Sequence, residues 1–158
     1  MADNHSPEVR SYNMSRIKGK DTKPEEIVRK YLFAHGFRYR KNDPRLPGKP
    51  DIVLPMYRTC ILVNGCFWHG HQGCIYFVWP KNNEEFWRNK INGTIERDRR
   101  QYRELEDLGW RILIVWECEL KKDRCKDTLH RLVLSQPVRL YGVQSAVVVE
   151  YRPAERQL

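Results

Sequence analysis

The sequence lacks any apolar run that approaches the roughly 18 residues needed for a membrane-spanning helix. Its N-terminus is polar and lacks the short apolar segment of a secretory signal peptide. A basic amphipathic helix with an apolar face, which could bind an anionic membrane surface, is also missing. We therefore expect a cytoplasmic protein that does not bind membranes.

Cysteine is scarce, and its count is odd. The five cysteines are Cys60, Cys66, Cys74, Cys118 and Cys125. An odd count in a chain without a secretion signal argues against a disulfide framework, because cytosolic thiols stay reduced. Metal binding is the better explanation for these thiols.

Positive charge, by contrast, is abundant and unevenly distributed. The net charge is +9 over 158 residues, and residues 10–49 contain twelve Lys and Arg against four Asp and Glu. We interpret residues 1–20 as a basic arm and residues 21–158 as a single domain. This charge predicts attraction to polyanions, with nucleic acid as the favoured partner. The alternative is a solvated arm without a fixed partner.

One helix is clearly indicated after residue 22. Thr22 to Glu25 fits a capping box, in which Glu25 accepts a hydrogen bond from the Thr22 backbone N–H. Apolar residues then recur at helical spacing from Ile27 to Leu32, and Gly36 fits the C-terminal stop.

The rest of the chain predicts strands that alternate with helices. Strands are expected at residues 37–41, 51–54, 60–63, 110–116 and 145–151, and helices at residues 82–108 and 125–134. We expect a break in the long helix at Asn92-Gly93. The run at residues 110–116 is apolar without alternation, which predicts a strand covered on both faces. Helices flanking a mixed sheet give a three-layer α/β/α sandwich.

Potential metal ligands are concentrated in one glycine-rich loop. Cys66, His69, His71 and Cys74 lie within nine residues, and Cys118 directly follows the strand expected at residues 110–116. Three thiolates and one imidazole suit a closed tetrahedral zinc site. Either histidine could complete the set. The alternative is a scatter of buried cysteines with a surface histidine.

Asp51 begins an apolar strand directly after Pro50. Phosphodiester nucleases often place an aspartate there to hold Mg²⁺ against the scissile phosphate, because this hard cation prefers oxygen ligands. An aspartate that only forms a turn is the commoner explanation of a Pro-Asp dipeptide. The usual acidic-x-Lys companion on the following strand is absent, since the sequence there reads Val63-Asn64-Gly65.

Two aromatic pairs interrupt polar sequence, Phe67-Trp68 in the cysteine-rich loop and Phe86-Trp87 in the long helix. Exposed aromatic side chains can stack on nucleobases or wedge between them. Core packing is the alternative, and it is the one we prefer for Phe86. Phe67 and Trp68 lie in a loop that a metal would constrain, which favours outward display.

Asp98 falls on the apolar stripe of the long helix, three residues after Ile95 and four before Tyr102. An inward carboxylate needs a partner. The neighbouring arginines at positions 97, 99 and 100 could supply a structural ion pair. The other interpretation is that Asp98 orients a catalytic histidine.

Between about Ser11 and Leu134, six blocks of this sequence resemble the very short patch repair (Vsr) DNA mismatch endonucleases. They are Asp21-Thr22 to Glu25, Leu46 to Asp51 (LPGKPD), Gly65 to His71 (GCFWHGH), Phe86-Trp87, Glu96 to Arg100 (ERDRR), and Leu108 to Arg111 with Trp116 to Cys118. The order of the blocks makes the resemblance specific. The segment after about Gln136 carries no motif of the family.

The resemblance implies a fold like that of type II restriction endonucleases, with a structural zinc site added. Members of the family act in bacteria where deamination of 5-methylcytosine leaves T opposite G, and they nick the strand 5′ to the mispaired T. We therefore expect a Mg²⁺-dependent endonuclease domain whose partner is duplex DNA with a T·G mismatch. A nucleoid-associated monomer is expected, with a MutL-type repair factor as a candidate partner.

The resemblance also assigns roles in catalysis. Asp51 would be the central Mg²⁺ ligand, together with the main-chain carbonyl of Val63. His69 would be the general base or would position the water, Asp98 would orient it, and Glu25 would support the metal site through water. Asn64 stands where some members carry histidine, which leaves the role of that position open.

Zinc and DNA ligands follow from the same resemblance. Cys66, His71, Cys74 and Cys118 would bind Zn²⁺, with one extra residue before Cys74. Phe67, Trp68 and Trp87 would wedge into the duplex beside the mispair. The DNA contacts assigned to the basic arm are Met14, Arg16, Lys18 and Lys20.

Three other classes of protein are compatible with the residues alone. They are a nuclease of the same fold with another target, a zinc-stabilised DNA-binding module without catalysis, and an anionic-membrane-binding protein, which the absence of a basic amphipathic helix with an apolar face makes remote. Asp51, His69 and Glu25 together favour an enzyme over a binding module. Phe67-Trp68 favours mispairs over intact duplex, because a T·G wobble stacks poorly and opens at lower cost.

Overall fold

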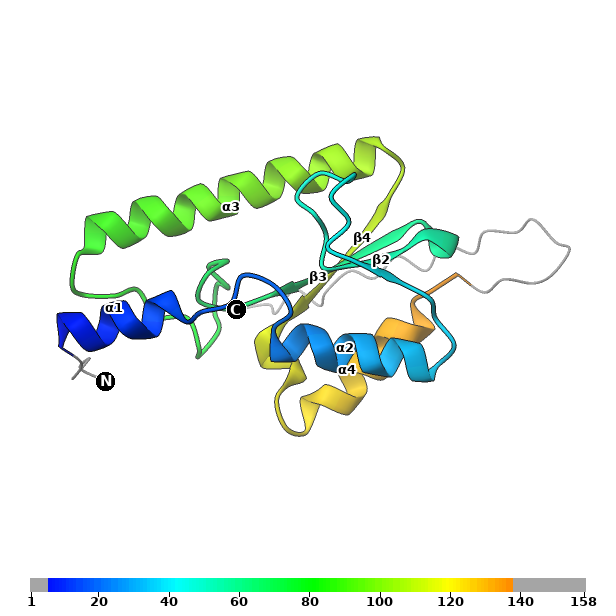
Figure 1. Cartoon of the computed structure of the whole chain (residues 1–158), viewed down its shortest axis with the longest axis horizontal. Coiled ribbons are helices and arrows are strands. Elements are labelled where there is room, and N and C mark those ends of the chain that lie inside the picture. The colour runs from blue at the N-terminus through cyan, green and yellow to red at the C-terminus, as the bar shows by residue number, and fades with distance from the viewer. Residues whose placement is uncertain (1–5, 138–158) are drawn as a thin grey trace, which may run out of the picture.

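The computed structural model describes residues 6–137, which form a mixed four-stranded sheet with helices on both faces (Figure 1). The sheet order is β1-β2-β3-β4, where β2 pairs antiparallel with β1 and β3, and β4 pairs parallel with β3. The strands are β1 (Arg40–Lys41), β2 (Ile52–Leu54), β3 (Thr59–Asn64) and β4 (Arg111–Trp116). The helices are α1 (Pro7–Ser15), α2 (Lys23–Ala34), α3 (Glu84–Asp107) and α4 (Arg124–Leu134), with short 3-10 helices η1 (Pro55–Tyr57) and η2 (Glu117–Leu120).

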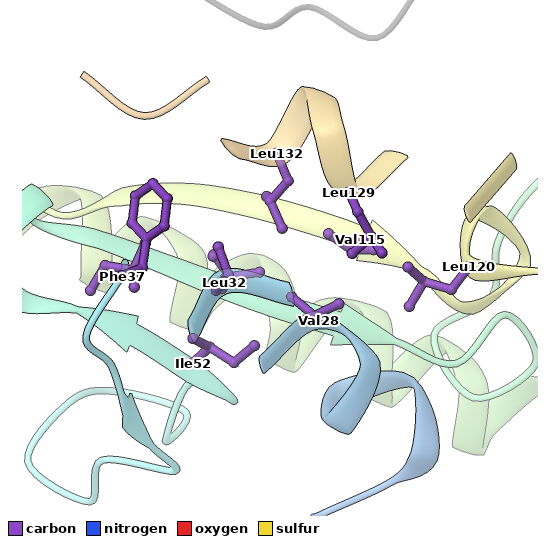
Figure 2. Close-up of a cluster of buried hydrophobic side chains, with 10 residues drawn as sticks. Val28, Leu32, Phe37, Ile52, Val115, Leu120, Leu129 and Leu132 are labelled. Atoms are coloured by element: carbon purple, nitrogen blue, oxygen red, sulfur yellow. The ribbon is translucent and has the colours of Figure 1, made fainter. Parts of the chain in front are cut away.

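Successive side chains of β2 and β3 point to opposite faces of the sheet, so the core consists of two clusters, one on each face. One cluster joins the sheet to α2 and α4, and its members include Val28, Leu32, Ile52, Leu54, Ile61, Val115, Leu129 and Leu132 (Figure 2). The other cluster joins Val53 and Cys60 to Leu105 of α3. Figure 1 accordingly shows α3 on one side of the sheet and α2 with α4 on the other. The α/β class predicted from the sequence is confirmed.

Helix α2 begins and ends where the sequence predicted. Gly36 adopts a positive φ of 86°, and the Phe37 N–H donates to the Leu32 carbonyl at 3.0 Å, which is the Schellman stop. The capping box was wrong in detail, because the Thr22 hydroxyl donates to Glu25 Oε1 at 2.8 Å and makes no cap to the helix backbone. Glu25 Oε2 instead accepts from the Asp21 N–H at 2.9 Å.

Helix α3 is continuous, so the break predicted at Asn92-Gly93 was wrong. Ile91 is fully buried, and Ile91 and Ile95 both pack against the backbone of Gly70 in the cysteine-rich loop. These contacts lie on either side of Gly93. A glycine in a helix interior costs only about 1 kcal/mol relative to alanine, which packing of this kind overrides.

Three strand predictions differ from the structure or fall outside it. The strand expected at residues 37–41 is reduced to Arg40–Lys41, because the Phe37 N–H is already bonded at the end of α2. Both core clusters reach β4, through Ile112 on one face and Leu113 on the other, but Ile114 is 37% exposed, so the strand is incompletely covered. The strand expected at residues 145–151 lies outside the described residues.

The basic arm expected at residues 1–20 contains α1, which the sequence analysis did not predict. Ser6 caps this helix by accepting from the Val9 N–H at 3.3 Å. Across residues 6–137, no helix is long and apolar enough to span a membrane.

Candidate active site and metal centre

The strand directions bring the predicted site residues to one edge of the sheet. Parallel strands β3 and β4 end at the same edge, with Asn64 paired with Trp116 in register. Strand β2 runs antiparallel to β3 and therefore begins at that edge, directly after Asp51. The loop that contains Cys66 follows β3, and Cys118 follows β4. Residues far apart in the sequence therefore meet here.

Cys66, His71, Cys74 and Cys118 form a compact cluster whose ligand atoms all lie within 4.8 Å of one another. His71 Nδ1 lies 3.6 Å from Cys118 Sγ. A tetrahedral ion with Zn–S of about 2.3 Å and Zn–N of about 2.0–2.1 Å separates its sulfur and nitrogen ligands by about 3.6 Å. The donor set and its spacing therefore fit a four-coordinate zinc ion. Cys60 and Cys125 lie outside the cluster.

The surroundings of this cluster suit a cation. Burial raises the pKa of Cys66 to about 12, and it also raises the pKa of Cys118, so the thiolate form needs compensating positive charge. Burial lowers the pKa of His71, which favours the neutral imidazole that binds metals. The His71 ring stacks on Trp116 at 3.9 Å, which fixes its orientation.

Asp51 is held by the end of strand β3. Its Oδ2 accepts a hydrogen bond from the Val63 N–H at 2.8 Å. Burial raises the pKa of Asp51 to about 6, the Val63 hydrogen bond opposes that rise, and the negative charge of Glu25 adds to it. A half-buried carboxylate beside a second carboxylate is an environment that a divalent cation would stabilise.

Glu25 is only 3% exposed, and both of its oxygens already have partners. Besides the Asp21 N–H and the Thr22 hydroxyl, Arg29 lies 3.3 Å from Oε2. Arg29 is also buried and contacts Asp21 at 3.2 Å. These contacts fix Glu25 in position. Its negative charge raises the pKa of Asp51. The prediction that Glu25 serves only the helix N-terminus or only a metal is too simple for these contacts.

His69 does not join the metal-ligand cluster but contacts Asp98 of α3. Its Nδ1 lies 2.5 Å from Asp98 Oδ2, and Asp98 is only 8% exposed. Because a carboxylate only accepts, Nδ1 carries the proton in this contact and the lone pair of Nε2 stays available. Arg97 is farther from Asp98, at 3.8 Å. Of the two interpretations of Asp98, the geometry therefore favours the one in which it orients a histidine.

The three aromatic residues assigned to DNA come together from two elements. Phe67 of the loop lies 5.2 Å from Trp68 and 5.4 Å from Trp87 of α3 between ring centroids, and Trp68 lies 6.1 Å from Trp87. All three are half-buried. The preference for Phe86 in the core was wrong, because it is 56% exposed, with an edge contact to Trp87 and the Lys90 ammonium 5.7 Å above its ring.

The residues predicted for the basic arm lie in and after α1. Arg16, Lys18 and Lys20 are exposed and Met14 is half-buried. The Arg16 guanidinium lies 4.7 Å above the Tyr12 ring. None of the four makes a hydrogen bond or ion pair with the candidate site among the described residues.

Sequence reasoning missed two residues of this site. Arg29 lies one turn after Glu25, and that i, i+4 spacing was the available signal. Tyr102 lies one turn after Asp98 and was interpreted only as part of an apolar stripe. Its hydroxyl accepts a hydrogen bond from Asn64 Nδ2 at 3.0 Å.

Comparison with known proteins identifies a family. The family model for the DNA mismatch endonuclease Vsr matches residues 2–75. The DNA mismatch endonuclease Vsr of Escherichia coli (strain K12) is 46% identical over 121 residues, which cover 77% of this chain and 77% of that protein.

Two nicking enzymes are also similar. The type II nicking enzyme V.NmeAIP of Neisseria meningitidis serogroup A is 51% identical over 134 residues, covering 84% of this chain and 95% of the relative. The type II nicking enzyme V.XorIIP of Xanthomonas oryzae pv. oryzae is 45% identical over 120 residues, covering 76% of this chain and 88% of the relative.

Proposed function

The chain belongs to the Vsr family of DNA mismatch endonucleases, and from that membership we propose that it nicks duplex DNA 5′ to the T of a T·G mispair. Its relatives are named as a mismatch endonuclease and as nicking enzymes, which supports the coarser activity, DNA nicking at a mismatch. The observation that carries the finer proposal is the His69–Asp98 pair beside Asp51, at the edge where the aromatic cluster also lies.

His69 is the proposed general base. Hydrolysis of a phosphodiester needs a water molecule that loses a proton as it attacks phosphorus. Asp98 accepts from Nδ1, so Nε2 can take that proton while the carboxylate stabilises the resulting imidazolium. The His69 side chain is one-quarter exposed, so water can reach it.

Asp51 and the main-chain carbonyl of Val63 are the proposed ligands of Mg²⁺, and Glu25 supports them at a distance. The set is all oxygen, as this cation prefers, and the two carboxylates repel each other without it. When bound, Mg²⁺ would neutralise negative charge at the scissile phosphate. The Val63 N–H holds Oδ2 of Asp51, and the Arg29 and Asp21 contacts hold Glu25, so this oxygen site is preorganised.

Phe67, Trp68 and Trp87 are the proposed means of detecting the mispair. A T·G wobble stacks poorly, so inserting aromatic rings beside it costs less than opening a matched step. Phe67 lies edge-to-face on both Trp68 and Trp87, and the three rings are half-buried, which gives the cluster support from α3. Zn²⁺ at Cys66, His71, Cys74 and Cys118 is proposed to hold the loop that carries Phe67 and Trp68.

The proposal also covers the general organisation of the protein. We propose one endonuclease domain preceded by a basic arm at residues 1–20, with a fold related to type II restriction endonucleases. The arm would bind the DNA backbone through Arg16, Lys18 and Lys20, which are exposed. The enzyme would act as a monomer, with a MutL-type repair factor as a candidate partner.

A nicking assay tests the proposal. Matched duplexes that differ only in one pair (T·G, U·G, T·A or C·G) are incubated with the protein, with and without Mg²⁺, in several flanking sequences. The expected result is a Mg²⁺-dependent nick 5′ to the T of T·G and none in T·A. Asp51→Asn should bind the T·G duplex and fail to nick it. Equal cleavage of T·A and T·G would show a nuclease with another target, and binding without cleavage in any context would show a DNA-binding module.

A further inference from the structure

Tyr102 occupies a position between the two halves of the candidate site. It lies one turn after Asp98 on α3, and its hydroxyl reaches the end of β3, where Asn64 Nδ2 donates to it at 3.0 Å. Asp98 holds the proposed base His69, and the residue before Asn64 holds Asp51. The hydroxyl is near enough to both carboxylates that each contributes to raising its pKa, after burial as the main cause.

The hydroxyl of Tyr102 has a proton to donate. An amide NH₂ only donates, so the contact with Asn64 uses a lone pair of the phenolic oxygen. Among the described residues, no hydrogen-bond acceptor is recorded for the Tyr102 O–H. Burial and the two carboxylates raise the pKa of Tyr102 to about 12, so the group stays protonated at neutral pH. Tyr102 is half-buried, so a ligand can approach it.

We propose that Tyr102 is a further catalytic residue, whose O–H donates a hydrogen bond to a non-bridging oxygen of the scissile phosphate. The inference rests on the proposed function and adds a neutral hydrogen-bond donor to this site. The Tyr102 hydroxyl is hydrogen-bonded to Asn64, next to the residue that holds Asp51, and Tyr102 lies one turn from Asp98, which holds His69, so a phosphate bound by Asp51 and His69 would lie near this hydroxyl. Negative charge increases on those oxygens as water attacks, so a fixed donor lowers the barrier more than it strengthens binding.

Asn64 acts through Tyr102 as a positioning residue. It is buried at the end of β3, and its amide donates to the phenolic oxygen, which holds the hydroxyl in place and leaves the O–H proton for another acceptor. The competing interpretation is that the pair only anchors α3 to β3. That interpretation predicts a loss of thermal stability when the pair is broken, with no dependence on the phosphate of the substrate.

The first test compares Tyr102→Phe with the matched control Tyr57→Phe in the full chain. Tyr57 packs on the core at η1, at the opposite end of the β2–β3 hairpin from Asp51. Under single turnover on the T·G duplex, Tyr102→Phe should nick roughly 100-fold more slowly, the effect of removing one oxyanion donor. Tyr57→Phe should nick at the wild-type rate. In the Tyr102→Phe background, Asn64→Ala should cause no further slowing, whereas independent roles would make the two losses multiply.

The second test detects the hydrogen bond between Tyr102 and the phosphate by binding, without any nicking. Binding without Mg²⁺ is measured on the T·G duplex and on the same duplex with a methylphosphonate at the phosphate 5′ to the T. Tyr102→Phe should weaken binding to the natural duplex by about tenfold and leave binding to the methylphosphonate duplex unchanged. An equal effect on both duplexes, or a wild-type nicking rate for Tyr102→Phe, would overturn the inference. Failure of the wild-type protein to nick T·G would instead overturn the proposed function, and the binding comparison would still decide the contact.

Discussion

Replacing Cys118 with alanine should lower the stability of the protein as a whole, because Cys118 joins two elements of the structure in the metal-ligand cluster. Cys118 is the one ligand in the cluster that comes from η2, whereas the other three come from the loop after β3. A metal ion therefore ties that loop to the end of β4. A ligand that binds only the folded state stabilises it by about 4 kcal/mol when its free concentration is 1,000 times its dissociation constant.

Loss of that stabilisation should lower Tm by roughly 8–16 °C, since 1 kcal/mol corresponds to about 2–4 °C in a chain of this size. Cys60→Ala is the matched control. Cys60 is 0% exposed and Cys118 is 6% exposed, so both substitutions remove one buried sulfur atom, but Cys60 lies outside the cluster. We expect Cys60→Ala to lower Tm by a few degrees through the small cavity alone.

The assay combines elemental analysis with thermal denaturation. Wild type and Cys60→Ala should each carry one zinc per chain, and a chelator should lower their Tm to near that of Cys118→Ala. Cys118→Ala should carry little zinc and respond weakly to the chelator. The reasoning is refuted if the purified wild-type protein contains no zinc, or if Cys118→Ala loses no more stability than Cys60→Ala.

The other predictions concern DNA and the carboxylates. If the Lys and Arg side chains of residues 10–49 neutralise about six phosphates, affinity for duplex DNA should fall roughly a thousandfold between 50 and 200 mM salt, and a nearly flat dependence would show that this basic segment does not touch the backbone. Trp68→Ala should reduce the preference for T·G over T·A by roughly tenfold in a binding assay, as loss of one stacking contact predicts, and full discrimination would assign Trp68 to packing alone. Glu25→Gln cannot accept from both the Asp21 N–H and the Thr22 hydroxyl as the carboxylate does, so Tm should fall by about 2–4 °C. It should also nick T·G roughly 10- to 100-fold more slowly with partial rescue at higher Mg²⁺, and a wild-type rate would remove Glu25 from the catalytic set.

Local sequence signals predicted the fold where the deciding contacts are local. The start and stop of α2 follow from Thr22, Pro24 and Gly36, and the β2–β3 hairpin follows from two short apolar runs around a turn. The break at Gly93 was wrong because contacts of Ile91 and Ile95 with a distant loop decide that segment. The coverage of β4 likewise depends on its place in the sheet order, which its own residues do not encode.

The candidate site divides in the same way. The metal-ligand cluster could be predicted because three of its residues lie close together in the sequence and cysteine has few other uses in such a loop. The sequence could not predict which of His69 and His71 belongs to the metal-ligand cluster, because that depends on which histidine faces Asp98. Tyr102 was missed for a similar reason, since a tyrosine on an apolar stripe usually packs in the core and only the position of Asn64 shows otherwise.

The metal-ligand loop and the active site are parts of one structure, which gives the proposed zinc a consequence beyond stability. His69 and Trp68 lie between the ligands Cys66 and His71, and the His71 N–H closes the turn on the Cys66 carbonyl at 2.9 Å. Gly70 has a φ of 60°, and a Cβ there would lie 2.7 Å from Cδ1 of Ile95. Only glycine lets α3 approach the turn this closely without displacing that side chain, and the same helix carries Asp98 and Trp87. A metal that fixes the turn would therefore also fix the distance from His69 to Asp98 and the packing of Trp68 on Trp87, so a single loop would align the proposed proton acceptor and the aromatic cluster.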